Sequence, residues 1–155
     1  MKTCGRKTLA IRSLLPGAIT WAEARSDEIL GAGAPLSDVG MRLARTVGVE
    51  CPERIRISTV NSIPLPGDFE LRTAALETGL IGPGTAGMTL GYGIYILDGC
   101  ESHRLISHEC RHVYQYEQAG SIKAFLPHYL RQIAEFGYDN APYELDAREH
   151  EIEIA

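Results

Sequence analysis

Two histidines four residues apart constrain the fold of this chain most. His108 and His112 stand within residues 102–119, a stretch that predicts a helix. Residues four apart share one face of a helix, so both imidazoles can reach a single metal ion from consecutive turns. The opposite side carries a narrow apolar stripe made of Ile106, Cys110 and Val113. The stretch therefore predicts a helix that is anchored in a core and turns its histidines away from it.

The residue after the first histidine is an acid. At 3.6 residues per turn, Glu109 lies about 100° round the helix from His108 and about 60° from His112. It therefore flanks a bound metal ion without being forced to bind it. The pattern His-Glu-Cys-Arg-His has the ligand spacing of a zinc site, and Glu109 is placed to accept a proton from a water molecule that the ion activates.

Length and composition indicate one domain over residues 1–155, long enough to bury a real core. The chain is 45% hydrophobic and 23% charged, and its net charge is only −5. Basic residues are scattered and aromatic residues do not interleave with them, so nucleic-acid binding is not expected. No uninterrupted apolar run reaches membrane-spanning length, so no membrane partner is expected either.

The four cysteines are irregularly spaced and form no C-x-x-C pair, which argues against a disulfide framework and against a thiolate zinc site. Reduced thiols in a cytoplasm fit best. Basic residues followed by a weakly apolar stretch at the N-terminus leave export as the alternative, although Arg12 and Pro16 interrupt that stretch. Residues 1–19 are expected to form a flexible arm.

The remaining periodicities predict an α+β domain that is mostly helical and has a small sheet. Expected helices cover residues 20–30, 36–47, 69–78, 121–136 and 142–151, and an alternating strand covers residues 54–60. Residues 88–96 also alternate and predict one strand of about ten residues. Gly91 and Gly93 within it mark a bulge, a tight sheet crossing, or the wall of a cleft in which an edge strand receives an extended peptide.

A catalytic zinc site needs a third protein ligand. Gln118 excludes a further histidine six residues after His112. In the last helix, Glu144 offers a carboxylate in the first turn, and Ala147 one turn later is small enough to let that helix approach closely. Glu144 is therefore the candidate, although an acid in a first turn is also favoured by the helix dipole alone.

The other candidate ligands face elsewhere. Asp146 and His150 lie about 200° and 240° round the last helix from Glu144. His103 is rotated off the face of His108, and His128 sits beside Pro127 on another helix. These residues are interpreted as surface or locally hydrogen-bonded groups, and Cys110 is interpreted as part of the core.

His108-Glu-Cys-Arg-His112, followed 32 residues later by Glu144-x-x-Ala147, resembles the gluzincin branch of the zincin metallopeptidases. Gln115 adds a resemblance to short bacterial H-E-x-x-H proteins of undetermined substrate. The resemblance covers residues 87–148 and implies a minimal zincin-like domain with an edge strand beside the H-E-x-x-H helix. It also implies Zn²⁺ on His108, His112 and Glu144, with Glu109 as general base. Arg148 departs from the pattern, which usually has an acid there.

Together these features predict a zinc-dependent hydrolase, most simply a metallopeptidase that cleaves amide bonds of an extended peptide or protein substrate. Tyr138, ahead of His128, is the candidate donor to the developing oxyanion, and Tyr143 is expected to pack. The alternatives are a non-catalytic, metal-stabilised binding or regulatory module, and a chain whose two histidines bind no metal. The sequence does not identify the substrate or the oligomeric state.

Overall fold

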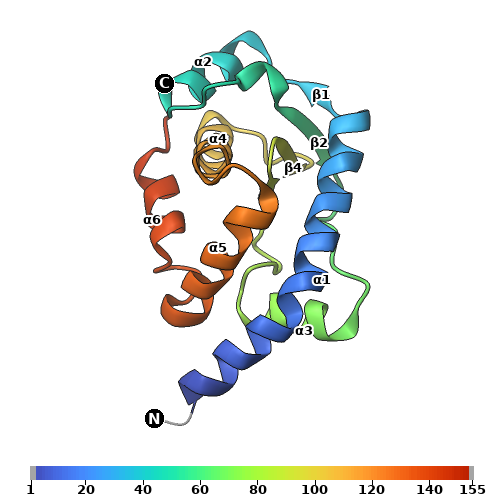
Figure 1. Ribbon diagram of the computed structural model, residues 1–155. Helices are drawn as coiled ribbons and strands as arrows, with labels where there is room; N and C mark the ends of the chain where they lie inside the picture. Colours follow the sequence, from blue (N-terminus) through green and yellow to red (C-terminus); the bar gives the residue numbers. More distant parts are fainter. Residues whose placement is uncertain (1–2, 154–155) are drawn as a thin grey trace.

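The computed structural model describes residues 3–153 and shows an α+β fold, as predicted, in which helices surround a four-stranded sheet (Figure 1). The strands are β1 (Ala34–Pro35), β2 (Arg56–Val60), β3 (Gly87–Leu90) and β4 (Gly93–Leu97), in the spatial order β1-β2-β4-β3. β2 and β4 are parallel, and the two outer pairs are antiparallel. β3 therefore forms one edge of the sheet.

The first helix, α1 (Thr3–Ala32), is longer than predicted and runs diagonally across the molecule (Figure 1). An arm was expected over residues 1–19, but residues 3–19 are the first half of α1; residues 1 and 2 lie outside the described part. The expected helix start at Thr20 is also wrong. The Thr20 hydroxyl donates to the carbonyl of Pro16 one turn earlier, because a capping pattern inside a continuing helix has no free amides to cap.

The other helices agree with the predicted spans to within a few residues. They are α2 (Asp38–Thr46), α3 (Phe69–Glu77), α4 (His103–Ala119), α5 (Ile122–Phe136) and α6 (Pro142–Glu149); the short 3₁₀ helix η1 (Pro52–Arg54) was not predicted. Side-chain caps fix several starts: Asp68, Ser102 and Ser121 each accept the amide three residues later. Gly120 ends α4 with a φ of 100°, a conformation that favours glycine.

The predicted single strand at residues 88–96 is wrong. It is a hairpin, β3 and β4, joined by Gly91 and Tyr92, and Gly91 has a φ of 67°. In a single strand, the even-numbered residues 88–96 would all share one face. In the hairpin, Leu90 pairs with Gly93 and Thr89 with Ile94, so the even-numbered residues of β4 lie on the face opposite to those of β3. The apolar residues of the two strands therefore divide between the two faces of the sheet.

The two faces carry two cores. On one face, Ile94 and Ile96 pack with α2 and α4, and the predicted stripe is fully buried: Ile106, Cys110 and Val113. On the other face, Leu90 and Tyr95 pack with α1 and α5 around Phe125. α4 thus lies against one face with its histidines directed toward the junction between the cores.

None of the helices within residues 3–153 combines the length and the apolar character needed to cross a membrane.

Candidate metal centre

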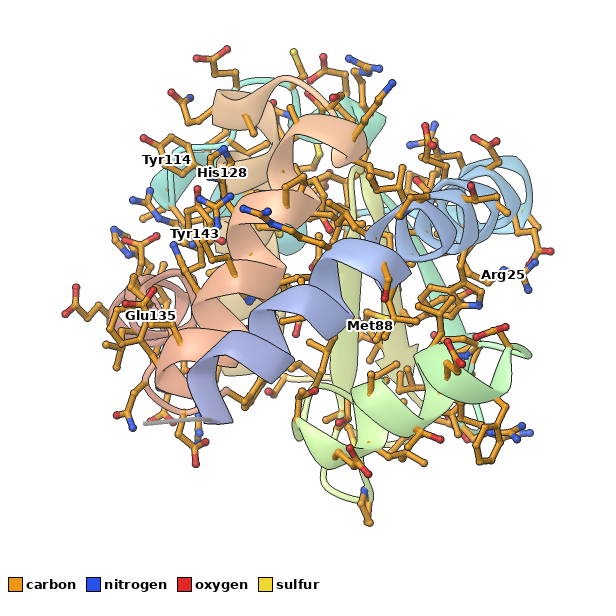
Figure 2. All side chains as sticks on the ribbon, turned by 60° about the horizontal axis from the view of Figure 1, so that its bottom comes forward. Arg25, Met88, Tyr114, His128, Glu135 and Tyr143 are labelled. Atoms are coloured by element: carbon orange, nitrogen blue, oxygen red, sulfur yellow. The ribbon has the colours of Figure 1, made fainter. Side chains whose placement is uncertain are left out.

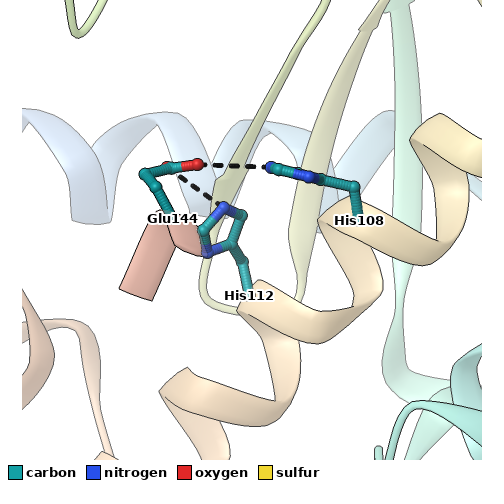
Figure 3. A group of neighbouring side chains, drawn as sticks. All are labelled: His108, His112 and Glu144. Carbon is teal, nitrogen blue, oxygen red and sulfur yellow. Dashed lines mark ion pairs between the residues drawn. The ribbon is translucent and has the colours of Figure 1, made fainter. Parts of the chain in front are cut away.

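Three side chains that were predicted to bind a metal converge beside α4 (Figure 3). His108 Nε2 lies 3.3 Å from Glu144 Oε2, and His112 Nε2 lies 3.2 Å from Glu144 Oε1. One donor atom from each residue lies within 4.8 Å of the other two. The structure therefore brings together all three predicted ligands, although Glu144 follows His112 by 32 residues and lies on another helix.

Local sequence positions both helices. Pro142 begins α6 at a position where its missing amide costs nothing. Ala147 is fully buried one turn after Glu144, and this small side chain lets α6 lie close to α4, as predicted. Arg111 fixes the contact, because its guanidinium donates two hydrogen bonds to Asp146 at 2.8 and 3.2 Å and a third to the carbonyl of Val47.

The ring of His112 is oriented by Gln115. Gln115 Nε2 donates to the carbonyl of Tyr143 and to the carboxylate of Asp146, both at 2.9 Å. These partners only accept, so Gln115 Oε1 must face His112 Nδ1, 2.8 Å away. Nδ1 therefore carries the proton of the neutral ring, and Nε2 directs its lone pair at Glu144.

The ring of His108 is oriented by a carboxylate that the sequence analysis missed. Glu151 Oε1 lies 2.9 Å from His108 Nδ1, and its second oxygen accepts from Arg104 Nε at the same distance. The amide of Ile152 donates to Ser107 Oγ, which holds this segment on α4. Glu151 thus supplies the acidic group that the resembled pattern has at position 148, where this chain has Arg148. Because Glu151 holds Nδ1, His108 Nε2 also directs its lone pair at Glu144.

This arrangement fits a metal ion. Two nitrogen lone pairs aimed at a carboxylate repel it unless positive charge, from a metal ion or from protons on the rings, lies between them. Glu144 Oε2 is buried and has no hydrogen-bond partner among the described residues. Donor atoms around a tetrahedral zinc at 2.0–2.2 Å stand roughly 3.3–3.6 Å apart; His108 and His112 lie 3.3 and 3.2 Å from different oxygens of Glu144, and a set of one donor atom per residue lies within 4.8 Å. Two imidazoles and one carboxylate are also a donor set that suits zinc.

The same geometry explains how the metal-free site holds its charges. Burial alone would lower the pKa of His112, but the carboxylate of Glu144 raises it to about 9. Burial works against charge on Glu144 too, yet His108, His112 and the Tyr129 hydroxyl lower its pKa well below the ordinary value. Tyr129 donates to Glu144 Oε1 at 2.7 Å. Without a metal, protons on the histidines take the place of the missing cation.

Glu109, the predicted base, is held beside the cluster by β3. The hydroxyl of Thr89 donates to Glu109 Oε2 at 2.6 Å, and a side chain at Gly87 would begin 2.8 Å from Glu109 Oε1. The hairpin register turns both residues toward α4. The sequence pattern pointed to Gly91 and Gly93 instead, because residues 88–96 alternate like one strand; the close approach that requires glycine is at Gly87.

The edge of the sheet beside the cluster is short. The amide of Leu97 donates to the carbonyl of Ala86 directly opposite, so the alternation of antiparallel bonding leaves the amides of Gly87 and Thr89 facing away from β4. The Thr89 carbonyl already accepts from Tyr116 at 3.2 Å. The edge strand lies beside α4 as predicted, and its free backbone groups centre on Gly87.

Two pockets meet at the cluster. An apolar pocket under α1, α3 and α5 reaches Glu109, His112 and Glu144, and a second groove, more open and with a larger polar share, reaches His108 and Glu109. Tyr138 lines both. Its hydroxyl makes no hydrogen bond within residues 3–153, and burial together with the carboxylates of Glu144 and Glu109 raises its pKa, so it stays protonated.

The remaining candidates lie away from the cluster. His103 and His128 are exposed, and Figure 2 shows His128 near the periphery, far from Met88, which lies between α1 and α3. His150 bonds to the carbonyl of Asp146. Tyr143 packs on Phe125, with ring centres 4.9 Å apart, as predicted. Cys110 is buried, and burial raises its pKa to about 12, as expected of a packing thiol.

Comparisons with protein-family models, with curated proteins and with solved structures gave no match.

Proposed function

We propose that the protein is a zinc-dependent hydrolase that cleaves amide bonds, most simply a metallopeptidase. The observation that carries the proposal is that His108 Nε2 faces the unpartnered Oε2 of Glu144 and His112 Nε2 faces Oε1, with Glu109 beside them in a pocket. A structural site needs its ligands only. A carboxylate held close to the ligands, and exposed to a pocket, is what hydrolysis needs in addition.

In this proposal His108, His112 and Glu144 hold the zinc ion. When bound, zinc lowers the pKa of water toward neutrality and polarises a carbonyl oxygen. Glu109 accepts the proton of the attacking water at its carboxylate and then delivers it to the leaving amine nitrogen. The hydrogen bond from Thr89 and the close packing on Gly87 keep that carboxylate in one position, so little freedom is lost when the substrate arrives.

Tyr138 is the proposed donor to the oxyanion that forms at the substrate carbonyl. Its hydroxyl lies on the wall of both pockets, is protonated, and donates to no other described group. Tyr129 is unsuited to this role because its hydroxyl already donates to Glu144. His128 is unsuited because it is exposed on α5.

The decisive experiment measures zinc content and peptide cleavage together. Purified protein is expected to hold one zinc ion per chain and to cleave members of a peptide library. Glu109→Gln should abolish cleavage and retain zinc, whereas the matched change Glu135→Gln, at an exposed position on α5, should alter neither. Stoichiometric zinc without cleavage of any peptide would refute the hydrolase and favour the metal-stabilised binding module.

A further inference from the structure

We infer that the apolar pocket beside the cluster selects the substrate: it binds a compact apolar side chain, aromatic or branched aliphatic, on the residue next to the bond that is cleaved. This inference rests on the proposed function. Much of the pocket wall comes from α1, α3, α5 and β3, which carry no metal ligand, and α4 and α6 close it at Glu109, His112, Tyr116 and Glu144. Representative wall residues are Leu14, Trp21, Leu71, Leu126 and Ile133.

The lining of this pocket includes Glu109 together with His112 and Glu144, two of the three residues of the cluster. A side chain in the apolar part would therefore sit directly beside the reacting carbonyl. Because the pocket is lined almost entirely by apolar surface, whereas the groove that also reaches Glu109 has a larger polar share and is more open, the two sides of the bond meet different surroundings. Only one of the two neighbouring residues is constrained to be apolar.

Of the hydroxyls that line the apolar pocket, only that of Tyr138 is not already used within the described residues, and it is the proposed oxyanion donor. Thr89 donates to Glu109, Tyr116 donates to the Thr89 carbonyl, and Tyr129 donates to Glu144. A polar substrate side chain would lose its water and find none of these three donors free, which penalises it. The pocket therefore rejects polar side chains as well as attracting apolar ones.

The size of the pocket sets the size of its occupant. Its volume is about 150 Å³, similar to an engineered apolar cavity that binds benzene. A leucine or phenylalanine side chain matches this volume, and an alanine leaves most of it empty. Burying such a side chain favours it by roughly 1.5–3 kcal/mol over leaving it exposed, which corresponds to an expected preference of about 10- to 100-fold over alanine.

Trp21, the only tryptophan of the chain, lies in the pocket wall and reports its occupancy. We expect N-acetyl-phenylalaninamide and N-acetyl-leucinamide to bind the zinc-loaded protein at least 10-fold more tightly than N-acetyl-alaninamide does. Binding is followed by the change in Trp21 fluorescence. Equal affinity for the three amides would overturn the inference. Affinity that rises steadily along linear acyl amides up to dodecanoyl would also overturn it, because the occupant would then be an extended chain.

Cleavage supplies the second arm. Peptides that differ only beside the scissile bond should show the same 10- to 100-fold preference in kcat/KM. Ala18→Leu, which fills part of the pocket from α1, should reduce that preference below 3-fold and leave zinc content unchanged. Ala24→Leu, on the exposed side of the same helix, is the matched control and should keep the preference.

The outcomes separate the two proposals. Cleavage without any side-chain preference overturns the pocket and leaves the hydrolase standing. A preference that Ala18→Leu does not reduce also overturns the pocket, because selection must then occur elsewhere. Zinc binding without any cleavage overturns the hydrolase, and with it the role of the pocket in choosing a substrate, whatever Trp21 reports.

Discussion

Replacing Gly87 by alanine tests how the predicted base is held. The new methyl carbon would lie 2.8 Å from Glu109 Oε1 and 3.1 Å from its Cδ and Cγ, closer than real contacts allow. The backbone of Gly87 is not in the left-handed region, so alanine fits the strand itself. Glu109 must therefore move by several tenths of an ångström and weaken its 2.6 Å hydrogen bond from Thr89.

The size of the effect follows from that hydrogen bond. A hydrogen bond to a charged group contributes about 1.5–3 kcal/mol to the free energy of unfolding. Alanine in place of glycine raises that free energy by about 0.4–1 kcal/mol, because it restricts the unfolded chain. The net loss of stability is roughly 1–2 kcal/mol, which corresponds to a fall in Tm of about 2–8 °C for a domain of this size. If Glu109 is the base, its displacement should also lower kcat by about 100-fold.

The assays are thermal unfolding, zinc content and peptide cleavage. Gly82→Ala is the matched control, because nothing lies within 4 Å of its new methyl group, and its Tm should stay the same or rise slightly. Zinc content should be unaffected in both variants, since neither glycine contacts a ligand. Equal Tm values for the two variants would refute the packing of Glu109 against Gly87, and loss of zinc in Gly87→Ala alone would place Glu109 among the ligands.

Three further predictions follow from the same contacts. Glu151→Gln should weaken zinc binding about 10- to 100-fold by releasing His108, as measured by competition with a chromophoric chelator. Glu153→Gln, at an exposed position, is the control and should not weaken it. Equal affinities would show that Glu151 does not orient the ligand. Phe125→Ala should lower the free energy of unfolding by about 3–5 kcal/mol, measured by denaturant unfolding, because the ring is buried. Phe136→Ala, at a half-exposed position, should lower it far less. Similar losses in the two variants would contradict the burial of Phe125 in the core. Removal of zinc with a chelator should abolish cleavage and leave far-UV circular dichroism and cooperative unfolding in place, since two apolar cores remain; collapse of the fold would favour the structural site.

Local patterns predicted most of the helices and the ligand set. The spacing of His108 and His112 depends only on helix geometry, and Ser102, Asp68 and Pro142 mark helix starts through bonds to their immediate neighbours. The position of Glu144 beside the histidines depends on the tertiary structure. It was predicted because its helical face and the small Ala147 made a close approach possible, and by resemblance.

The predictions that failed concern choices that local sequence does not determine. Alternation continues through a two-residue turn, so residues 88–96 carry the same pattern as a strand or as a hairpin, and only the pairing partner decides. For the same reason Thr89 and Gly87 were not linked to Glu109. Glu151 lies just after α6, where no periodicity applies, and its place beside His108 depends on how the segment returns to α4.

The order of the site residues along the chain has a consequence for biosynthesis. Both histidines precede Glu144 by at least 32 residues, and Glu151 follows later still. At about 5–20 residues per second, a ribosome needs roughly 2–6 seconds to make the intervening stretch. During that interval the nascent chain offers two imidazoles without their acidic partner. Under the proposed function, all three ligands are present only after α6 has been translated, so a chain that ends before Glu144 cannot hold the complete zinc site.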